Sequence, residues 1–417
     1  MRLHDKAKAI LRQNDQGGYT LPTFGLYPYQ WNWDSAFAAW GFTTFDPDRG
    51  WRELETLFSG QWDDGMLPHI LFHRIDPGYF PGPEVWQGRG PIPSSGITQP
   101  PVAASFMAKM LVMHPDGKTR ARALWKKLKA WHAWFMEWRL DQGAVCVTHP
   151  WEAGRDNAPD WDSAMRTIDV TGIGEYTRRD TSHVDPSMRP TKYDYDRYLK
   201  LVQLGASVGW DQRELKKINP FRVADPTMTF TLLRANRDLR DMGQSFGEDV
   251  TQIENWIKTL EDGAKTLWNE NIKGYDSRDA HTGAFNGVLS NASALCWYAG
   301  IDNAEARPAV ERMMDAATYG LASFNPEADG FEPLRYWRGP TWPIMNFLVG
   351  SGVEERGISA VADRIRTDTR HLMKLNGFAE YYDPLTGKPA GGDSFTWTAA
   401  VWLGWAGDFP KSERGVA

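Results

Sequence analysis

Cysteine is nearly absent from this chain of 417 residues. The two that occur, Cys146 and Cys296, form no Cys-x-x-Cys pair, so neither a disulfide framework nor a cysteine-based zinc site is expected. No apolar run reaches the roughly 18 residues needed to span a membrane. The first ten residues also lack the continuous apolar stretch of a secretory signal. We therefore expect a cytoplasmic protein that does not associate with membranes.

An excess of charge of one sign is also missing. The chain has 47 Lys and Arg against 53 Asp and Glu, and no basic run is longer than Lys126-Lys127. A nucleic-acid partner is therefore not expected, because its binding requires a basic patch. Aromatic residues, by contrast, are abundant, with 21 Trp, 14 Tyr and 19 Phe. Because a buried indole N–H needs a partner, core packing alone does not explain so many Trp, and a polyhydroxylated ligand suits them.

Helical periodicity dominates the chain, and strand-like alternation is confined to short pieces such as residues 144–148. No Ser- or Pro-rich linker divides the chain, so we expect one catalytic domain over residues 1–417. The expected helices cover residues 33–46, 50–61, 98–113, 117–139, 192–209, 225–242, 247–269, 288–299, 304–317, 339–351, 354–374 and 393–407. Two concentric rings of six helices, the all-α architecture called an (α/α)6 barrel, would use this number.

Several helix ends carry local signals. Asp225-Pro226 predicts a capping residue followed by proline in the first turn, and Asn303 is a second candidate cap. Gly300 and Gly352 are candidate stops just beyond helix ends. The longest loops, residues 62–97 and 151–191, are expected as insertions that form a cap over a funnel at one face of the barrel.

The segment from His149 to Asp162 reads His-Pro-Trp-Glu-Ala-Gly-Arg-Asp-Asn-Ala-Pro-Asp-Trp-Asp. It sets four acids, Glu152, Asp156, Asp160 and Asp162, among tryptophans and around a glycine. A carboxyl group held against indole rings is partly desolvated, which raises its pKa and lets it act as a general acid near neutral pH. The alternative for this stretch alone is an exposed acidic turn with its tryptophans in the core.

Other segments repeat this mixture of aromatic and polar residues near predicted helix starts. They are Tyr27-Pro-Tyr-Gln-Trp-Asn-Trp-Asp34, Tyr336-Trp-Arg-Gly-Pro-Thr-Trp342 and Phe378-Ala-Glu-Tyr-Tyr-Asp383, together with Gln99. Taken singly, Asp34 could be a helix-dipole carboxylate, Arg338 a cation–π corner and Glu380 a solvated acid. Together the segments predict one pocket for a polyol. Two carboxyl groups on its opposite sides would suffice for glycoside hydrolysis.

These segments resemble the signatures of glycoside hydrolase family 63, and they occur in the order found in that family. The compact length is most similar to that of its bacterial mannosylglycerate and glucosylglycerate hydrolases, and the Glu-x-Gly-x-Asp core is distantly similar to trehalases. The resemblance implies an inverting α-glycosidase on an (α/α)6 barrel, with Asp156 as general acid and Glu380 as general base. It also implies that a sugar subsite is lined by Tyr27, Trp31, Trp33, Asp34, Gln99, Tyr336, Trp337 and Trp342.

The leaving group implied by the resemblance is glycerate, whose carboxylate needs a cation and hydroxyl donors. Arg189 and Tyr195 match the glycerate-contacting pair of the glucosylglycerate enzymes. Tyr79, between Gly78 and Gly82, resembles a flap residue that would help to exclude water. We expect no cofactor and no metal, and a small carbohydrate as the binding partner. Self-association into a homo-oligomer stays open.

Three alternatives remain at this stage. The substrate could be another short α-glucoside, such as kojibiose, nigerose or trehalose. The sequence also does not decide whether the sugar of the substrate is mannose or glucose. A sugar epimerase or isomerase on the same barrel would need bases, for which His69 and His73, one helical turn apart, are candidates. A non-catalytic sugar-binding protein would keep the tryptophans but would have no reason to keep two opposed acids.

Overall fold

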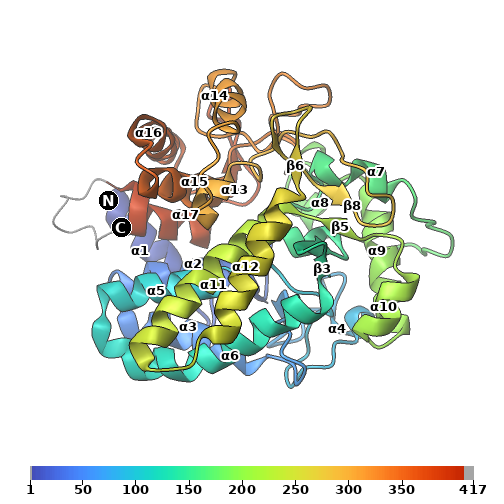
Figure 1. Ribbon diagram of the computed structural model, residues 1–417, viewed down its shortest axis with the longest axis horizontal. Helices are drawn as coiled ribbons and strands as arrows, with labels where there is room; N and C mark the ends of the chain where they lie inside the picture. The colour runs from blue at the N-terminus through green and yellow to red at the C-terminus, as the bar shows by residue number, and fades with distance from the viewer. Residues whose placement is uncertain (1, 408–417) are drawn as a thin grey trace.

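The computed structural model describes residues 2–407 and consists mainly of helices (Figure 1). The α-helices are α1 Leu3–Asn14, α2 Asn32–Thr43, α3 Pro47–Ser59, α4 Pro83–Trp86, α5 Ala103–Met113, α6 Lys118–Trp138, α7 Asp162–Met165, α8 Asp180–His183, α9 Lys192–Ser207, α10 Gln212–Ile218, α11 Pro226–Phe246, α12 Thr251–Lys265, α13 Leu295–Ala299, α14 Arg307–Asp315, α15 Pro343–Glu355, α16 Ser359–Asn376 and α17 Thr396–Val401. Short 3-10 turns cover η1 Pro115–Gly117, η2 Pro150–Ala153, η3 Pro159–Trp161 and η4 Pro186–Met188, and a π-helical turn, η5, covers Trp402–Ala406.

Six of these helices form a closed inner ring. Helix α2 packs on α5, α5 on α11, α11 on α13, α13 on α15, α15 on α17, and α17 on α2 again. Every residue of α2, α13 and α17 is buried, as expected for helices with packed neighbours on all sides.

An outer layer surrounds this ring. Helices α3, α12 and α16 pack on the inner helices that precede them, α6 packs on α5 and α11, and α1 packs on α17. Helix α14, which follows α13, adds Val310 and Met313 to the common core. The outer helices are amphipathic; in α12 the buried residues Ile253, Trp256, Ile257 and Leu260 follow the helical period. The expected (α/α)6 barrel is confirmed.

Local helix signals were only partly correct. Asp225 does cap α11 by accepting a hydrogen bond from the Met228 N–H, and Gly300, at φ +83°, does end α13. Asn303 does not cap α14, which begins at Arg307; its side chain instead accepts from the Glu305 N–H. Gly352 is not a stop, because α15 continues to Glu355. A Cβ at Gly352 would lie 2.3 Å from the Tyr298 backbone, so the glycine permits close packing of α13 on α15.

Other differences have equally local causes. The predicted helix at 288–299 is helical only from Leu295, because Ser290 bridges to Phe324 and hydrogen-bonds Asp160 instead. The predicted set lacks α1 and the short helices α4, α7, α8 and α10. Among the described residues no helix combines the length and apolar character that crossing a membrane requires.

The strands are short and antiparallel. They are β1 Gln30–Trp31, β2 Ile70–Leu71, β3 Leu140–Asp141, β4 Ala144–Val147, β5 Val223–Ala224, β6 Trp268–Asn269, β7 Gly274–Tyr275, β8 Arg278–Asp279, β9 Tyr381–Tyr382 and β10 Pro389–Ala390. The largest sheet has the order β3-β4-β5-β8, with Cys146 opposite Ala224 and Val223 opposite Asp279. Strand β4, which corresponds to the predicted strand at 144–148, leads directly into the acidic segment 149–162.

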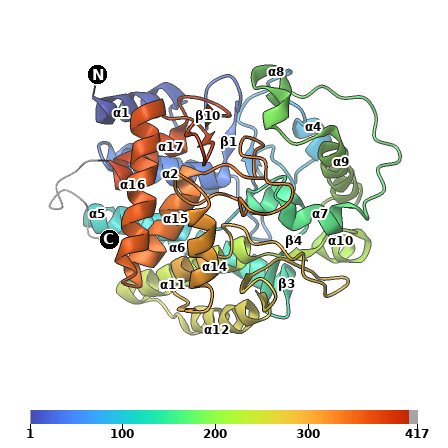
Figure 2. The same cartoon turned by 90° about the horizontal axis from the view of Figure 1, so that it is seen from above.

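Helices α4 and α7 to α10, which come from or follow the two long loops, lie together on one side of the ring in both views (Figures 1 and 2). Helix α4 packs on α9, and α9 on α10. One hydrophobic core joins this side of the molecule to the ring, with members from Ala7 to Ala406.

Candidate active site

One cavity collects most of the residues that the sequence singled out. Its wall contains Tyr27, Trp31, Trp33, Asp34, Tyr79, Gln99, Asp156, Arg189, Tyr195, Tyr336 and Glu380. Segments from β1, the start of α2, both long loops and the β9–β10 hairpin therefore meet at one end of the ring. Trp337 and Trp342 do not lie on the wall.

Only one acid of the segment 149–162 faces this cavity. Glu152 is buried and pairs with Arg139 at 2.8 Å, and it also accepts hydrogen bonds from the N–H and hydroxyl of Thr148. Asp160 pairs with the buried Arg155 at 2.9 Å. These acids hold the segment in place, as does Asp162 through Arg338. Asp156 is the one that lines the cavity.

The backbone of this segment is fixed close to α2. Gly154 has φ +67°, and a Cβ there would lie 2.6 Å from the Trp33 ring. A side chain is therefore excluded both by the left-handed conformation and by the indole. The Tyr198 hydroxyl donates a 2.7 Å hydrogen bond to the Asp156 carbonyl. The turn thus carries the Asp156 carboxyl group into the cavity on a rigid backbone.

Burial raises the pKa of Asp156 to about 7, with Arg189 opposing the shift and Glu380 adding to it. A carboxylic acid with this pKa keeps its proton in a large fraction of molecules at neutral pH. It can then donate that proton to a leaving oxygen.

Glu380 is held at the start of the β9–β10 hairpin. Its Oε2 accepts a 2.8 Å hydrogen bond from the Gly392 N–H, and its Oε1 accepts one of 3.0 Å from the Tyr27 hydroxyl. Gly391 lies at φ +72°, where a Cβ would meet Glu380 Oε2 at 2.3 Å. Burial raises the pKa of Glu380, and the positive charge of Arg189 opposes this. The hairpin therefore presents an oriented carboxylate that keeps lone pairs available for water.

Arg189, near the end of the second long loop, contacts both Glu380 and Asp180. Its Nη2 donates to the Tyr27 hydroxyl at 2.7 Å, its Nε donates to Asp180 at 3.1 Å, and the Tyr336 ring lies 3.9 Å from its Cζ. Its Nη1 is 3.6 Å from Glu380 Oε2, is buried, and has no hydrogen-bond partner among the described residues. A buried guanidinium with an unused donor can accept an anionic ligand.

The lining of the cavity includes another unpaired polar atom. Asp34, in the first turn of α2, is 4% exposed, and its Oδ1 has no hydrogen-bond partner within the described part of the chain. Burial is the largest cause that raises the pKa of Asp34 well above its usual value. Gln99 is fixed beside it, because its Oε1 accepts a 3.1 Å hydrogen bond from the Trp33 N–H. Hydroxyl groups of a sugar would satisfy such atoms.

Trp337 and Trp342 support the wall from behind. Their rings stack at 3.9 Å with an interplanar angle of 4°, and both are buried. Trp342 Nε1 donates to the Tyr336 carbonyl at 3.2 Å, while Tyr336 itself adopts φ +39°, a conformation that non-glycine residues rarely take. The indole pair therefore fixes Tyr336 against Arg189 and Glu380.

Sequence reasoning missed several wall residues, namely Trp151, Arg179, Asp180, Phe395 and Trp397. Trp151 stands in the acidic motif, where a core position is the alternative to a sugar-binding surface; it is buried in the common core and also contributes to the cavity wall. Asp180 lies in the second long loop, where no aromatic–acid pattern marks it. The segment around Phe395 and Trp397 again mixes aromatic and polar residues before a helix, so the same pattern could have found it.

The two histidines considered as proton-shuttling bases are not assembled in this cavity. His69 lies on the wall, but burial holds its pKa well below the usual value, and its Nδ1 is paired with the Ser95 hydroxyl at 2.9 Å. His73 is not on the wall and is hydrogen-bonded to Gln30 Oε1. The described residues also contain no cluster of three or more ligands suited to a metal ion.

Comparison with known proteins gives a consistent result. A family described as the mannosylglycerate hydrolase MGH1-like glycoside hydrolase domain matches residues 27–398. A mannosylglycerate hydrolase of Thermus thermophilus is 43% identical, with 96% of this chain and 99% of the relative covered. A glucosylglycerate hydrolase of Mycolicibacterium hassiacum is 33% identical over 97% and 98% of the two chains.

A crystal structure of a family 63 mannosylglycerate hydrolase from Thermus thermophilus, in complex with Tris and D-glycerate, is similar to this fold. It superposes with a TM-score of 0.93 at 44% identity and covers 96% of this chain and 99% of its own.

Proposed function

Since the chain belongs to the mannosylglycerate hydrolase MGH1-like family and is a glycoside hydrolase, we propose that it hydrolyses α-mannosylglycerate to mannose and glycerate. The observation that carries the proposal is the cavity that joins two buried carboxyl groups to a buried arginine with an unused donor. The higher identity to the mannosylglycerate enzyme favours mannose over glucose in the sugar subsite. Glucosylglycerate is the second candidate.

In this proposal Asp156 donates its proton to the glycosidic oxygen, and Glu380 takes a proton from the water that attacks the anomeric carbon. The raised pKa of Asp156, about 7, suits an acid, and the two hydrogen bonds to Glu380 suit a base that must stay oriented. A general base acting through water leads to inversion at the anomeric carbon. Tyr27, Trp31, Trp33, Asp34, Gln99 and Tyr336 would line the sugar subsite, with Trp337 and Trp342 behind them.

The glycerate end would lie against Arg189 and Tyr195. Arg189 can offer its free Nη1 to the carboxylate, and Tyr195 lines the same side of the cavity. Because a desolvated carboxylate is costly unless it is paired, this arrangement distinguishes a charged leaving group from a neutral one.

We also propose that residues 1–417 act as one catalytic domain whose two long loops cap this cavity. Arg179 of the second loop forms an ion pair with Asp76 of the first and donates to the Gly78 carbonyl at 3.1 Å. Tyr79 and Arg179 both line the cavity. This contact joins the loops over the ligand and supports the exclusion of bulk water. A cytoplasmic location is part of the proposal and is supported by the two free, buried cysteines.

Product analysis tests the substrate and the stereochemistry together. On mannosylglycerate, glucosylglycerate, trehalose, kojibiose and nigerose, we expect the fastest release of hexose from mannosylglycerate. Proton NMR of the fresh product should show the β-anomer first, and the two carboxyl groups should stand roughly 6.5–9.5 Å apart in a substrate complex. A first-formed α-anomer would contradict inversion, and equal rates on the neutral disaccharides would contradict glycerate recognition.

Replacing Arg189 by alanine should remove a charge-assisted hydrogen bond of about 1.5–3 kcal/mol to the glycerate carboxylate. The ratio of kcat/KM for mannosylglycerate to that for methyl α-mannoside should therefore fall roughly ten- to a hundred-fold. The ratio is the informative quantity, because Arg189 also contacts Glu380 and its loss lowers both rates. Arg166, exposed and outside the active-site cavity, provides an Arg→Ala control. An unchanged ratio would mean that Arg189 does not bind the leaving group.

A further inference from the structure

The guanidinium of Arg189 is shared between two carboxylates on opposite sides. Nε donates to Asp180 Oδ2 at 3.1 Å, whereas Nη1 stops 3.6 Å from Glu380 Oε2 without a hydrogen bond. Arg189 is 3% exposed, so water competes little for its charge. The contact with Asp180 is thus the closer of the two, although Glu380 is the residue proposed to act on water.

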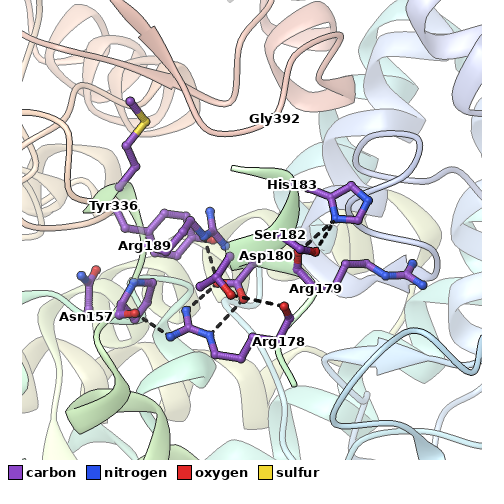
Figure 3. A network of polar contacts seen from close by, with 12 residues as sticks. Asn157, Arg178, Arg179, Asp180, Ser182, His183, Arg189, Tyr336 and Gly392 are labelled. Atoms are coloured by element: carbon purple, nitrogen blue, oxygen red, sulfur yellow. Dashed lines mark hydrogen bonds and ion pairs between the residues drawn. The ribbon is translucent and has the colours of Figure 1, made fainter. Parts of the chain in front are cut away.

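Asp180 is itself fixed on its other side. Arg178 donates to both of its oxygens, with Nε on Oδ1 at 3.0 Å and Nη2 on Oδ2 at 2.6 Å. Arg178 in turn donates to the Pro190 carbonyl at 2.7 Å, and its Cζ lies 4.0 Å from the Tyr195 ring centre. Figure 3 shows this chain of contacts, with Arg178 and Arg189 reaching Asp180 from two directions and Tyr336 beside Arg189. The carboxylate therefore has a defined place within the second long loop.

We propose that Asp180 is a positioning residue that holds Arg189 by its Nε and so keeps the guanidinium beside Glu380 but not bonded to it. This inference rests on the proposed function, in which Glu380 is the general base. Arginine and carboxylate readily form two parallel hydrogen bonds. Without Asp180, Arg189 is free to turn and form such a pair with Glu380. That pair would occupy the lone pairs that must receive the proton of water.

The charged and titratable groups around this pair come from several elements. Glu380 is faced by Arg189, Tyr27, Tyr336, Asp34 and Asp156. Arg189 is faced by Asp180, Glu380, Tyr27 and Tyr336, and Arg178 stands behind Asp180. Tyr381 faces both Arg189 and Glu380. Removing the charge of Asp180 strengthens the positive field at both Glu380 and Asp156, which lowers the pKa of each.

The test is Asp180→Asn, which keeps the shape and removes the charge. We expect kcat on mannosylglycerate to fall roughly ten- to a hundred-fold, because the new Arg189–Glu380 pair occupies the lone pairs of the base. Both limbs of the pH profile of kcat/KM should move to lower pH. Asp185→Asn, an equivalent change at an exposed site of the same loop, should leave the profile unchanged.

Two further variants separate positioning from a structural role. In an Arg189→Gln background, Asp180→Asn should change kcat at the pH optimum less than about twofold, because the loss of kcat passes through Arg189, whereas the direct field of Asp180 moves only the limbs of the profile. Arg178→Gln, which removes the cation on the other side, should move both limbs to higher pH. It serves as the test if Asp180→Asn does not fold.

A raised KM with an unshifted pH profile in Asp180→Asn would overturn the inference, as would an equal effect in the Arg189→Gln background. Failure of the wild-type enzyme to hydrolyse either glycosylglycerate would instead refute the proposed function, so the two failures are distinguishable.

Discussion

Asp156→Asn should lower kcat on mannosylglycerate by about a thousandfold or more, at the upper end of what a general acid contributes. Asparagine fills the same space but has no proton to give to the leaving oxygen. The fold should be retained, because the backbone here is fixed by Gly154, by the Tyr198 hydrogen bond and by the Glu152–Arg139 pair, all of which the substitution leaves intact.

The leaving group and the pH dependence both diagnose this role. Fluoride departs without protonation, so the Asp156→Asn variant should lose far less activity on α-mannosyl fluoride than on mannosylglycerate. In the wild type, kcat/KM should fall as the pH rises through about 7, because the acid then loses its proton. This alkaline limb should be absent in the variant. Equal losses of activity on the two substrates, or an alkaline limb that persists in the variant, would show that Asp156 is not the general acid. Asp169→Asn is the control, since that acid is exposed, is bonded to Thr171 in the same long loop and lies outside the cavity.

The sequence could predict the barrel because eleven of its helices are nearly continuous periodic segments. The twelfth predicted segment, residues 192–209, is α9 outside the ring, whereas α1, which packs on α17, was not predicted. The errors of the prediction come from contacts between distant segments. The chain from 288 to 294 has helical composition, yet Ser290 bonds Asp160 instead. In the sequence Gly352 resembles a helix stop, but in the structure it is the point where α15 comes close to the Tyr298 backbone.

In the site, too, the sequence predicts the segments but not the contacts between them. The motif 149–162 placed an acid in the cavity, but composition does not distinguish Asp156 from Glu152, whose partner Arg139 lies on the preceding helix end. Trp337 and Trp342 stood in the right segment, yet their mutual stacking turns them away from the wall. No sequence pattern around Asp180 marks it as part of the site, because its position depends on hydrogen bonds from Arg178 and Arg189 of the same loop.

Glu380→Gln should lower kcat by a factor comparable to that of Asp156→Asn, for a different reason. The amide is almost isosteric and can still accept the Gly392 N–H through its oxygen while its NH2 group faces the Tyr27 hydroxyl, so the hairpin should stay folded. It cannot take a proton from water, and water must attack whatever the leaving group is. The loss should therefore be as large on α-mannosyl fluoride as on mannosylglycerate, in contrast to Asp156→Asn.

Tyr27→Phe provides the matched control for Glu380→Gln. It removes one hydrogen bond to Glu380 and the acceptor of Arg189 Nη2 but leaves the carboxylate, so kcat should fall by roughly tenfold and not by a thousandfold. In Glu380→Gln the acidic limb of the kcat/KM profile should disappear, because the group that must be ionised is gone. The alkaline limb should remain but move to lower pH, because the Glu380 charge that helps to raise the pKa of Asp156 is gone. Each variant would thus lose a different limb and respond differently to the leaving group. If Glu380→Gln kept its acidic limb, or recovered activity on the fluoride as Asp156→Asn should, another carboxylate of the cavity, with Asp34 as the nearest candidate, would have to be the base.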